Sequence, residues 1–331
     1  MPELRQNIAT KEWVVIATER AKRPEDFVKK QEKKPALEFV QTCPFCPGNE
    51  DKTPAEVFSI KDDKGWKLRV VPNKFSALLP DIPWKKPYLS GLVRSLPGFG
   101  YHEVIVETPK HNLTTALLLE SDVLNIITSY KERNLEIAKD KRISLVIIFK
   151  NHGEAAGTSL EHPHSQLIAT PVVPNHIRTR LEEAMRYYDD HHTCVFCQMI
   201  EDEIADGRRI IIENKEFVAF VPYSAFSPFH IWLLPKRHFA SFFEINDLEM
   251  ESLSNILLDL LKRLYFGLSD PDFNYVIRQA PIDCSNANYF HWYISIVPRM
   301  GKSAGFELGS GMYINTSLPE ESGKFLREVK I

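Results

Sequence analysis

Two histidines and a glutamine stand at alternate positions in the run His162-Pro163-His164-Ser165-Gln166. In a β-strand, alternate side chains point to the same face, so the three would lie together. A neutral imidazole is nucleophilic near pH 7, and an amide can donate a hydrogen bond to a phosphoryl oxygen. The run therefore suits chemistry on a phosphate, with His164 as nucleophile and Gln166 as donor. Because Pro163 also suits an edge or a loop, a solvated turn is the alternative.

Four of the five cysteines form two C-x-x-C pairs, and histidines follow each pair in the same order. A C-x-x-C pair supplies two of the four ligands of a tetrahedral zinc site. The predicted ligands are Cys43, Cys46, His111 and His162 for the first site, and Cys194, Cys197, His238 and His291 for the second. A site with four protein ligands is closed, so we expect both Zn²⁺ ions to be structural. The alternative is a pair of redox dithiols with unrelated histidines.

The chain carries the same markers twice. The second cysteine of each pair precedes a Pro-Lys histidine by 65 and 41 residues, and the last ligand follows after 51 and 53. A helix pattern lies between them in each half, over 120–139 and 248–264. These repeats predict an α+β fold of two tandem units, with antiparallel sheets and flanking helices. We assign residues 1–175 and 190–331 to the two halves and 176–189 to a linker helix.

The second copy serves as an internal control for the first. Aligning His162 with His291 places Tyr293 opposite His164 and Ser295 opposite Gln166. The second copy thus keeps a metal ligand but has neither the nucleophile nor the amide. We therefore expect one active site per chain, with His162 bound to metal and His164 free for chemistry.

Composition excludes some other classes of protein. The net charge is −3, the hydrophobic content is 44%, and charges of both signs are interspersed. This pattern gives no support for binding to nucleic acid or to a membrane surface. The N-terminus has no apolar signal region and no apolar run approaches the length of a membrane span, so a cytoplasmic location is expected.

With these motifs in place, the chain resembles the galactose-1-phosphate uridylyltransferase family, the branch of the histidine-triad superfamily with a tandem duplicated fold. The resemblance covers nearly the whole chain. Besides the His-Pro-His-Ser-Gln run, it rests on Arg20-Ala21-Lys22-Arg23-Pro24, Cys43-Pro44-Phe45-Cys46, Val71-Pro72-Asn73-Lys74-Phe75, residues 151–157 with Ser159, Val221-Pro222-Tyr223, Ser227-Pro228-Phe229, Pro235-Lys236-Arg237-His238, Ala304-Gly305-Phe306-Glu307 and Tyr313-Ile314-Asn315.

The resemblance implies double displacement through a nucleotidyl group on His164, whose other ring nitrogen is held by the His162 carbonyl. The donor is a nucleoside diphosphate sugar, and the acceptor is a sugar 1-phosphate or phosphate. It also implies a homodimer in which the hexose-binding segment crosses from the other subunit. The substrate-binding residues it implies are Arg20 and Arg23 for phosphate, Asn73 for the base or ribose, Asn151, Gly157 and Ser159 along the phosphates, and Phe306 and Glu307 for the hexose.

Two departures from the family pattern leave the identity of the substrate undetermined. Tyr293 stands where many family members have a second histidine, and Tyr313 stands where some have a hexose-binding glutamine. The favoured function is UDP-glucose:hexose-1-phosphate (galactose-1-phosphate) uridylyltransferase, in galactose metabolism. One alternative is an adenylyltransferase with phosphate as acceptor, acting on ADP-glucose or adenylyl sulfate, as in relatives that share these changes. Further alternatives are a nucleotide hydrolase and a zinc-stabilised nucleotide-binding module without turnover.

Overall fold

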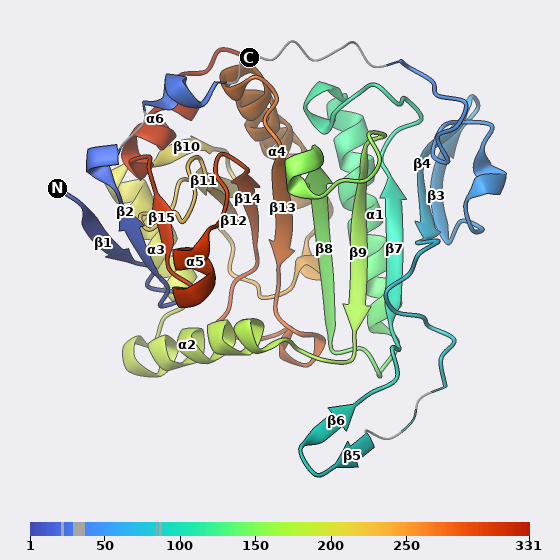
Figure 1. Cartoon of the computed structure of the whole chain (residues 1–331), viewed down its shortest axis with the longest axis horizontal. Helices are drawn as coiled ribbons and strands as arrows, with labels where there is room; N and C mark the ends of the chain where they lie inside the picture. The colour runs from blue at the N-terminus through green and yellow to red at the C-terminus, as the bar shows by residue number, and fades with distance from the viewer. Residues whose placement is uncertain (21–22, 29–36, 84, 86–87) are drawn as a thin grey trace.

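The computed structural model describes residues 1–20, 23–28, 37–83, 85 and 88–331. A ten-stranded sheet, in which every neighbouring pair is antiparallel, runs through the molecule (Figure 1). In spatial order its strands are β10 (Ile210–Glu213), β11 (Phe217–Phe220), β12 (Ile231–Pro235), β14 (Tyr293–Pro298), β13 (Phe273–Arg278), β8 (Leu145–His152), β9 (His164–Thr170), β7 (Tyr101–Val106), β4 (Gly65–Pro72) and β3 (Phe58–Asp62).

The two halves of the chain meet at the centre of this sheet, where β8 pairs with β13. Outward from that pair, β9, β7, β4 and β3 follow on one side, and β14, β12, β11 and β10 on the other. The order of strands is thus mirrored about the central pair, as a duplicated unit requires. The predicted α+β class with antiparallel sheets and flanking helices is confirmed, and the sheets of both units join into one.

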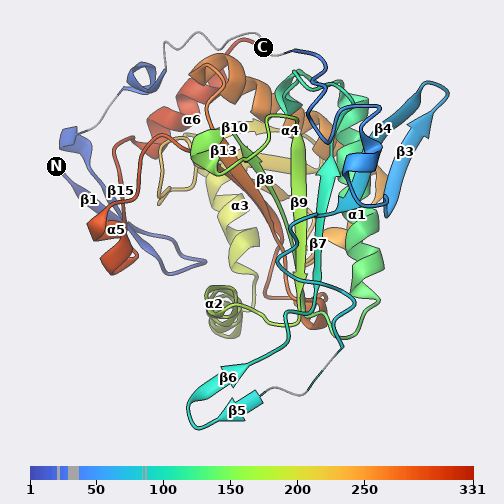
Figure 2. The same ribbon diagram turned by 45° about the vertical axis from the view of Figure 1, so that its right-hand side comes forward.

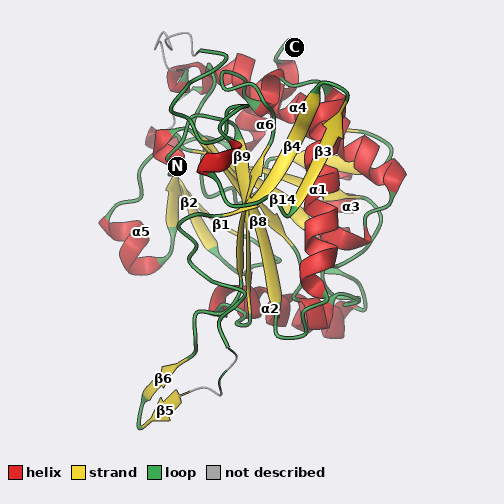
Figure 3. Cartoon of the chain, turned by 90° about the vertical axis from the view of Figure 1, so that its right-hand side faces the viewer, coloured by secondary structure: helices red, strands yellow, loops and turns green. Residues whose placement is uncertain are grey.

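Two long helices cover one face of the sheet. Helices α1 (Glu120–Ala138) and α4 (Asp247–Leu268) lie side by side there, as the edge-on view in Figure 3 shows. The α4 helix begins at a capping box, in which Asn246 and Glu249 satisfy each other's backbone N–H groups. Its apolar stripe and alternate residues of both half-sheets form the main core.

Each half also has a small apolar cluster on the opposite face of the sheet. In the first half, Phe45 and the two metal-site cysteines pack against Val71, Val104 and Val106. In the second half, Phe196 and Cys194 pack against Phe220, Trp232 and Tyr293 among others. The open face thus carries both predicted metal sites. The remaining helices are α2 (Asn175–His191), α3 (Val195–Asp206), α5 (Gly305–Ser310) and α6 (Pro319–Glu328).

Shorter elements surround the main sheet. The strands β1 (Glu3–Gln6), β2 (Trp13–Ile16) and β15 (Tyr313–Asn315) form a small sheet, and β5 (Tyr88–Ser90) with β6 (Val93–Ser95) forms a hairpin. The 3₁₀ helices are η1 (Thr18–Arg20), η2 (Pro24–Phe27), η3 (Glu50–Lys52), η4 (Thr115–Leu117), η5 (Glu154–Ala156), η6 (Phe242–Glu244) and η7 (Ile282–Cys284). No helix in the described ranges is long and apolar enough to cross a membrane.

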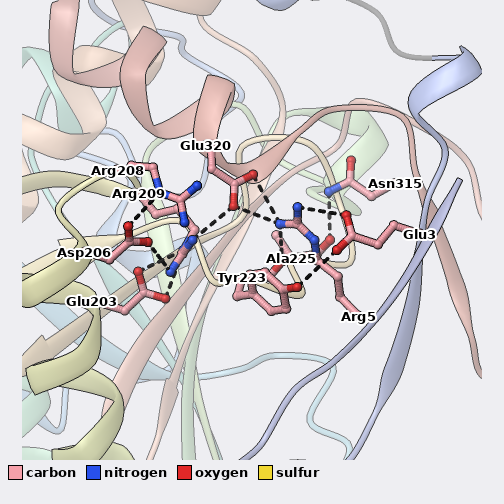
Figure 4. Close-up of polar contacts among 10 residues, drawn as sticks. All are labelled: Glu3, Arg5, Glu203, Asp206, Arg208, Arg209, Tyr223, Ala225, Asn315 and Glu320. Carbon is pink, nitrogen blue, oxygen red and sulfur yellow. Dashed lines mark hydrogen bonds and ion pairs between the residues drawn. The ribbon is translucent and has the colours of Figure 1, made fainter. Parts of the chain in front are cut away.

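A charged network fastens both ends of the chain to the second half (Figure 4). Arg5 on β1 and Arg209 beside β10 donate to the same carboxylate oxygen of Glu320 on α6, over 2.9 and 3.0 Å. The Arg5 guanidinium also lies 4.1 Å from the centre of the Tyr223 ring. Because these groups are largely buried and mutually paired, the network holds the small sheet against the body of the molecule.

One detail of the strand prediction is wrong. The strand β9 begins at His164, and β14 begins at Tyr293, so His162 and His291 precede their strands. Pro163 has no N–H for the sheet, and its carbonyl accepts a hydrogen bond from the Glu107 N–H over 3.1 Å. The His162 ring turns its Nδ1 toward the cysteines, and both His162 and His164 contact the Phe45 ring on this face of the sheet.

Candidate active site and metal centres

The four predicted ligands of the first metal site come together from three separate segments. Their sulfur and nitrogen ligand atoms all lie within 4.8 Å of one another, and all four side chains are buried. Cys46 Sγ lies 3.6 Å from His111 Nδ1, and Cys43 Sγ lies 3.7 Å from His162 Nδ1. Tetrahedral zinc, with Zn–S of about 2.3 Å and Zn–N of about 2.0 Å, would hold such atoms about 3.5 Å apart. The donor set and its spacing therefore fit zinc.

The orientation of His162 supports the same conclusion. Its Nε2 lies 2.8 Å from the Thr108 carbonyl oxygen and donates to it, so Nδ1 carries the lone pair that faces the cysteines. Burial lowers the pKa of His162 to about 4, which keeps the imidazole in the neutral form that binds metal. The side chain is thus fixed on both ring nitrogens once a metal binds.

The second site repeats this arrangement in the other half. Cys197 Sγ lies 3.3 Å from His238 Nδ1 and 3.6 Å from His291 Nδ1, and the four ligand atoms again lie within 4.8 Å. His291 Nε2 donates to the Pro235 carbonyl over 2.8 Å, as His162 does to Thr108. Both Cys2His2 clusters can therefore hold a metal ion, and the chemistry of their ligands is that of zinc.

His164 is the buried first residue of β9, with 7% of its surface exposed. Its Nδ1 lies 2.8 Å from the His162 carbonyl oxygen. Because a carbonyl only accepts, Nδ1 carries the proton and Nε2 keeps its lone pair. Burial lowers the pKa of His164, and the nearby charge of Lys150 acts in the same direction, against the hydrogen bond to His162. The ring is therefore neutral, and the lone pair on Nε2 is available for a nucleophilic role.

A buried ion pair on the helix-covered face of the sheet contacts the backbone of His164 at the start of β9. Lys150 on β8 donates to Glu107 over 2.7 Å and to the His164 carbonyl over 3.2 Å. The Lys150 side chain is 2% exposed and that of Glu107 is fully buried. Sequence reasoning missed this pair, although a lysine inside the apolar strand 144–151 was a signal that it needs a buried partner.

His102, a histidine outside the predicted site, positions Gln166. The Ala77 N–H donates to His102 Nδ1 over 3.1 Å, so His102 Nε2 carries the proton. That nitrogen lies 2.8 Å from Gln166 Oε1 and donates to it. The amide NH₂ of Gln166 is thereby left for another acceptor, such as a phosphoryl oxygen. The alternation of residues 101–106 is visible in the sequence and puts His102 and Val104 on the same face. The pairing of Val104 with Gln166, which brings His102 beside the amide, is seen only in the structure.

The second half contains the equivalent contact. Trp232 on β12 pairs with Ser295, as Val104 on β7 pairs with Gln166. His230, two residues before Trp232, lies 2.9 Å from Ser295 Oγ through its Nε2. A histidine that contacts the residue two positions after the nucleophile position is therefore retained in both copies, while His164 and the amide of Gln166 are not.

Other predicted substrate-binding residues gather around His164. Asn73 lies beside His102, with its Nδ2 3.1 Å from His102 Nε2; both nitrogens are donors, so this is a contact and not a hydrogen bond, and Asn73 Oδ1 accepts from the Phe75 N–H. Asn151 is the last residue but one of β8, and extending the register of β8 with β9 by two residues beyond Phe149 and Gln166 would place it opposite His164. Gly157 and Ser159 lie exposed in the loop between those strands, and Gly157 adopts the left-handed conformation at φ +88°.

The remaining predicted residues lie elsewhere in the chain. Arg23 is exposed at the start of η2, whose Phe27 packs against Phe229 in the second half. The side chain of Arg20 lies outside the described part. Phe306 and Glu307 belong to α5, which lies apart from β9 (Figures 1 and 2). The Glu307 carboxylate there accepts from the Ala304 N–H over 2.9 Å. One chain therefore does not bring Arg23, Phe306 and Glu307 to His164.

Comparison with known proteins identifies the relatives of this arrangement. An ADP-glucose phosphorylase from Arabidopsis thaliana is 35% identical over 334 residues, covering 100% of this chain and 93% of the relative. Its crystal structure with bound ADP-glucose matches with a TM-score of 0.86 over 100% of this chain and 99% of that one, at 34% identity. A galactose-1-phosphate uridylyltransferase from Thermotoga maritima is 27% identical over 343 residues, covering 100% of this chain and 99% of the relative.

The duplicated fold and these relatives define an enzyme of the nucleotidyltransferase class. Models of the galactose-1-phosphate uridyl transferase N-terminal and C-terminal domains match residues 1–174 and 180–308. The chain belongs to this family, as the sequence motifs predict.

Metal analysis tests the two clusters directly. We expect about two zinc ions per purified chain, because each cluster supplies a complete tetrahedral set. Cys43→Ser and Cys194→Ser should each lose about one zinc and unfold at lower temperature, since metal binding stabilises the folded state. Cys284→Ser is the matched control, because Cys284 belongs to neither cluster, and it should keep both ions. A zinc content near zero in the unmodified protein would refute both sites.

The role of His102 gives a second test. Gln166→Ala should lower kcat by roughly 10²–10³-fold, the effect of losing one preorganised donor to a reacting oxyanion. His102→Phe should give a smaller loss of the same kind, because the amide remains but loses its orientation. The exposed His191→Gln serves as the control and should leave kcat unchanged. Full activity in His102→Phe would show that Gln166 needs no such partner.

Proposed function

We propose that this protein is an adenylyltransferase that moves AMP from ADP-glucose to phosphate, releasing glucose 1-phosphate and forming ADP. The main support for this proposal is the full-length similarity to ADP-glucose phosphorylase, at 35% sequence identity and, for the crystal structure, a TM-score of 0.86. The family's uridylyltransferases match less well, at 27% identity for the Thermotoga maritima protein. This proposal replaces the uridylyl reaction favoured by the motifs alone, and hexose-1-phosphate uridylyl transfer remains the second candidate because family members carry that name.

In the first step, His164 Nε2 attacks the α-phosphorus of ADP-glucose. The bond from that phosphorus to the bridging oxygen breaks, and glucose 1-phosphate leaves with the electron pair. The imidazole ring becomes cationic when Nε2 bonds to phosphorus, while Nδ1 keeps its proton. The 2.8 Å hydrogen bond from Nδ1 to the His162 carbonyl stabilises this cation.

In the second step, an oxygen of inorganic phosphate attacks the same phosphorus. The P–N bond breaks, ADP leaves, and His164 returns to the neutral form. The amide of Gln166 lies on the same strand face two residues along, where it can donate to a non-bridging oxygen in both transition states.

The metal ions have a structural part in this proposal. Zinc in the first site would be held by Cys43, Cys46, His111 and His162, and would supply no activated water because its four positions are filled. Its contribution is to fix the backbone of His162, whose carbonyl orients His164. The second zinc would stabilise the other half in the same way.

A homodimer would complete the active site. Since α5 lies apart from β9 within one chain, Phe306 and Glu307 would serve the hexose in the site of a second copy. Arg23, which is also distant from β9, would bind phosphate across the same interface together with Arg20. This arrangement predicts the behaviour of a Phe306→Ala variant. The variant should still take the nucleotide onto its histidine, but it should lose its selectivity for the hexose.

Single-turnover kinetics test the proposed reaction. Without phosphate, ADP-glucose should release a burst of about one glucose 1-phosphate per chain, and phosphate should convert this to steady turnover with ADP as product. His164→Asn should lose at least about 10⁴-fold in kcat, as expected for removal of a nucleophile. The exposed His191→Asn is the matched control and should show the same burst as the unmodified protein.

Other outcomes separate the rival functions. A burst with UDP-glucose alone, discharged by galactose 1-phosphate, would replace the adenylyl proposal with the uridylyl reaction. AMP as the final product regardless of phosphate would identify a hydrolase. Full activity of His164→Asn would exclude every mechanism with a histidine intermediate.

A further inference from the structure

A small cavity lies on the open face of the sheet, where α2 passes over β8, β13 and β14. Its volume is about 20 Å³, enough for one or two water-sized atoms, and it opens to solvent. Most of its wall is apolar, from residues such as Ile177, Val276 and Phe290. Two arginines, Arg180 from α2 and Arg278 from β13, also line it.

These arginines lack adequate counter-charges. Arg278 makes no hydrogen bond or ion pair with any residue that the structure describes, and its Nε is buried without a partner. Arg180 Nε is also buried without a partner, and its Nη2 lies 3.5 Å from Glu12, whose side chain is 55% exposed. Burial lowers the pKa of Arg278, with the charge of Arg180 acting in the same direction. Two half-buried cations with so little compensation are unfavourable unless an anion joins them.

The third polar group of the cavity is Tyr293. Its side chain is 1% exposed, and none of the described residues makes a hydrogen bond with its hydroxyl. Gln279, the remaining polar residue of the wall, is already satisfied by Asn134, the Phe242 N–H and the Val146 carbonyl.

We propose that this cavity is a second anion site, which binds the phosphate group of inorganic phosphate or of a phosphate monoester. Guanidinium groups have only donors, and their forks match phosphate oxygens in bidentate geometry. Both guanidinium groups and the Tyr293 side chain line this one cavity, and its open mouth leaves room for the part of the anion or ester that extends beyond it. The apolar walls would strengthen the contacts by excluding water.

The site is separate from the one that holds the nucleophile. Arg278 lies on β13, two strands from β9, which is roughly 10 Å across the sheet. Tyr293 occupies the position in the second copy that His164 occupies in the first. The second copy would thus bind a phosphate group with no nucleophile to attack it, whichever nucleotide the active site uses.

Phosphate titration by calorimetry tests the proposal on the full-length chain. The unmodified protein should show a binding event at about one inorganic phosphate per chain, and His164→Asn should retain it. Arg278→Met and Arg180→Met should weaken this event at least tenfold. Arg178→Met is the matched control, because Arg178 lies exposed on the same helix and bonds only the Val173 carbonyl, and it should bind as the unmodified protein does. A parallel titration with glucose 1-phosphate distinguishes a site for the free anion from one for the ester.

Thermal unfolding distinguishes a binding arginine from one that only packs. In phosphate-free buffer, Arg278→Met should melt no lower than the unmodified protein, because it removes an uncompensated charge. Phosphate should then raise the melting temperature of the unmodified protein and of Arg178→Met, but not of Arg278→Met.

A tungstate-soaked crystal gives an answer that does not depend on any variant folding. An anomalous peak between the two guanidinium groups supports the site. Unchanged phosphate affinity in both arginine variants, or a carboxylate of a second copy seated between the guanidinium groups, would overturn it.

Discussion

The chemistry that we propose depends on one hydrogen bond, from His164 Nδ1 to the backbone carbonyl of His162 over 2.8 Å. The bond fixes the tautomer of the nucleophile and leaves Nε2 free to attack. The His162 carbonyl has a fixed position because the side chain of the same residue is held at both ring nitrogens. Its Nδ1 faces the cysteines, and its Nε2 donates to the Thr108 carbonyl. A metal held by His162 would thus also fix His164, the proposed nucleophile two residues away, and the buried Lys150 bonds the His164 carbonyl from the other face of the sheet.

The second half of the duplicated fold repeats much of this arrangement but lacks the histidine that we propose as the nucleophile. Both halves keep a Cys2His2 cluster, a histidine bonded to a backbone carbonyl, and a second histidine that contacts the residue two positions after the nucleophile position. These shared features maintain the fold of each half around its small apolar cluster. Tyr293 stands where the first half has His164, so the second half lacks the proposed nucleophile, and we infer that Arg180 and Arg278 give it a binding role instead.

The sequence predicts the larger features well, since they depend on local pattern and on repetition. The duplicated α+β fold, the two ligand sets and the adjacent roles of His162 and His164 follow from spacing and residue type. Contacts between distant segments do not, because strand register is unknown until the sheet is assembled. His102 gains its role only when β7 pairs with β9, and Glu107 meets Lys150 only across two strands. The motifs also do not predict which nucleotide is bound, because that choice depends on the shape of a pocket rather than on the spacing of residues.

The most direct test of the central claim is to identify the nitrogen that carries the nucleotide. Protein labelled with ¹⁵N-histidine and trapped with ADP-glucose in the absence of phosphate would show phosphorus–nitrogen coupling by NMR. The structure predicts a single adenylylated histidine, His164, bonded through Nε2, because Nδ1 is committed to the His162 carbonyl. A bond through Nδ1, or a nucleotide on any other residue, would contradict it.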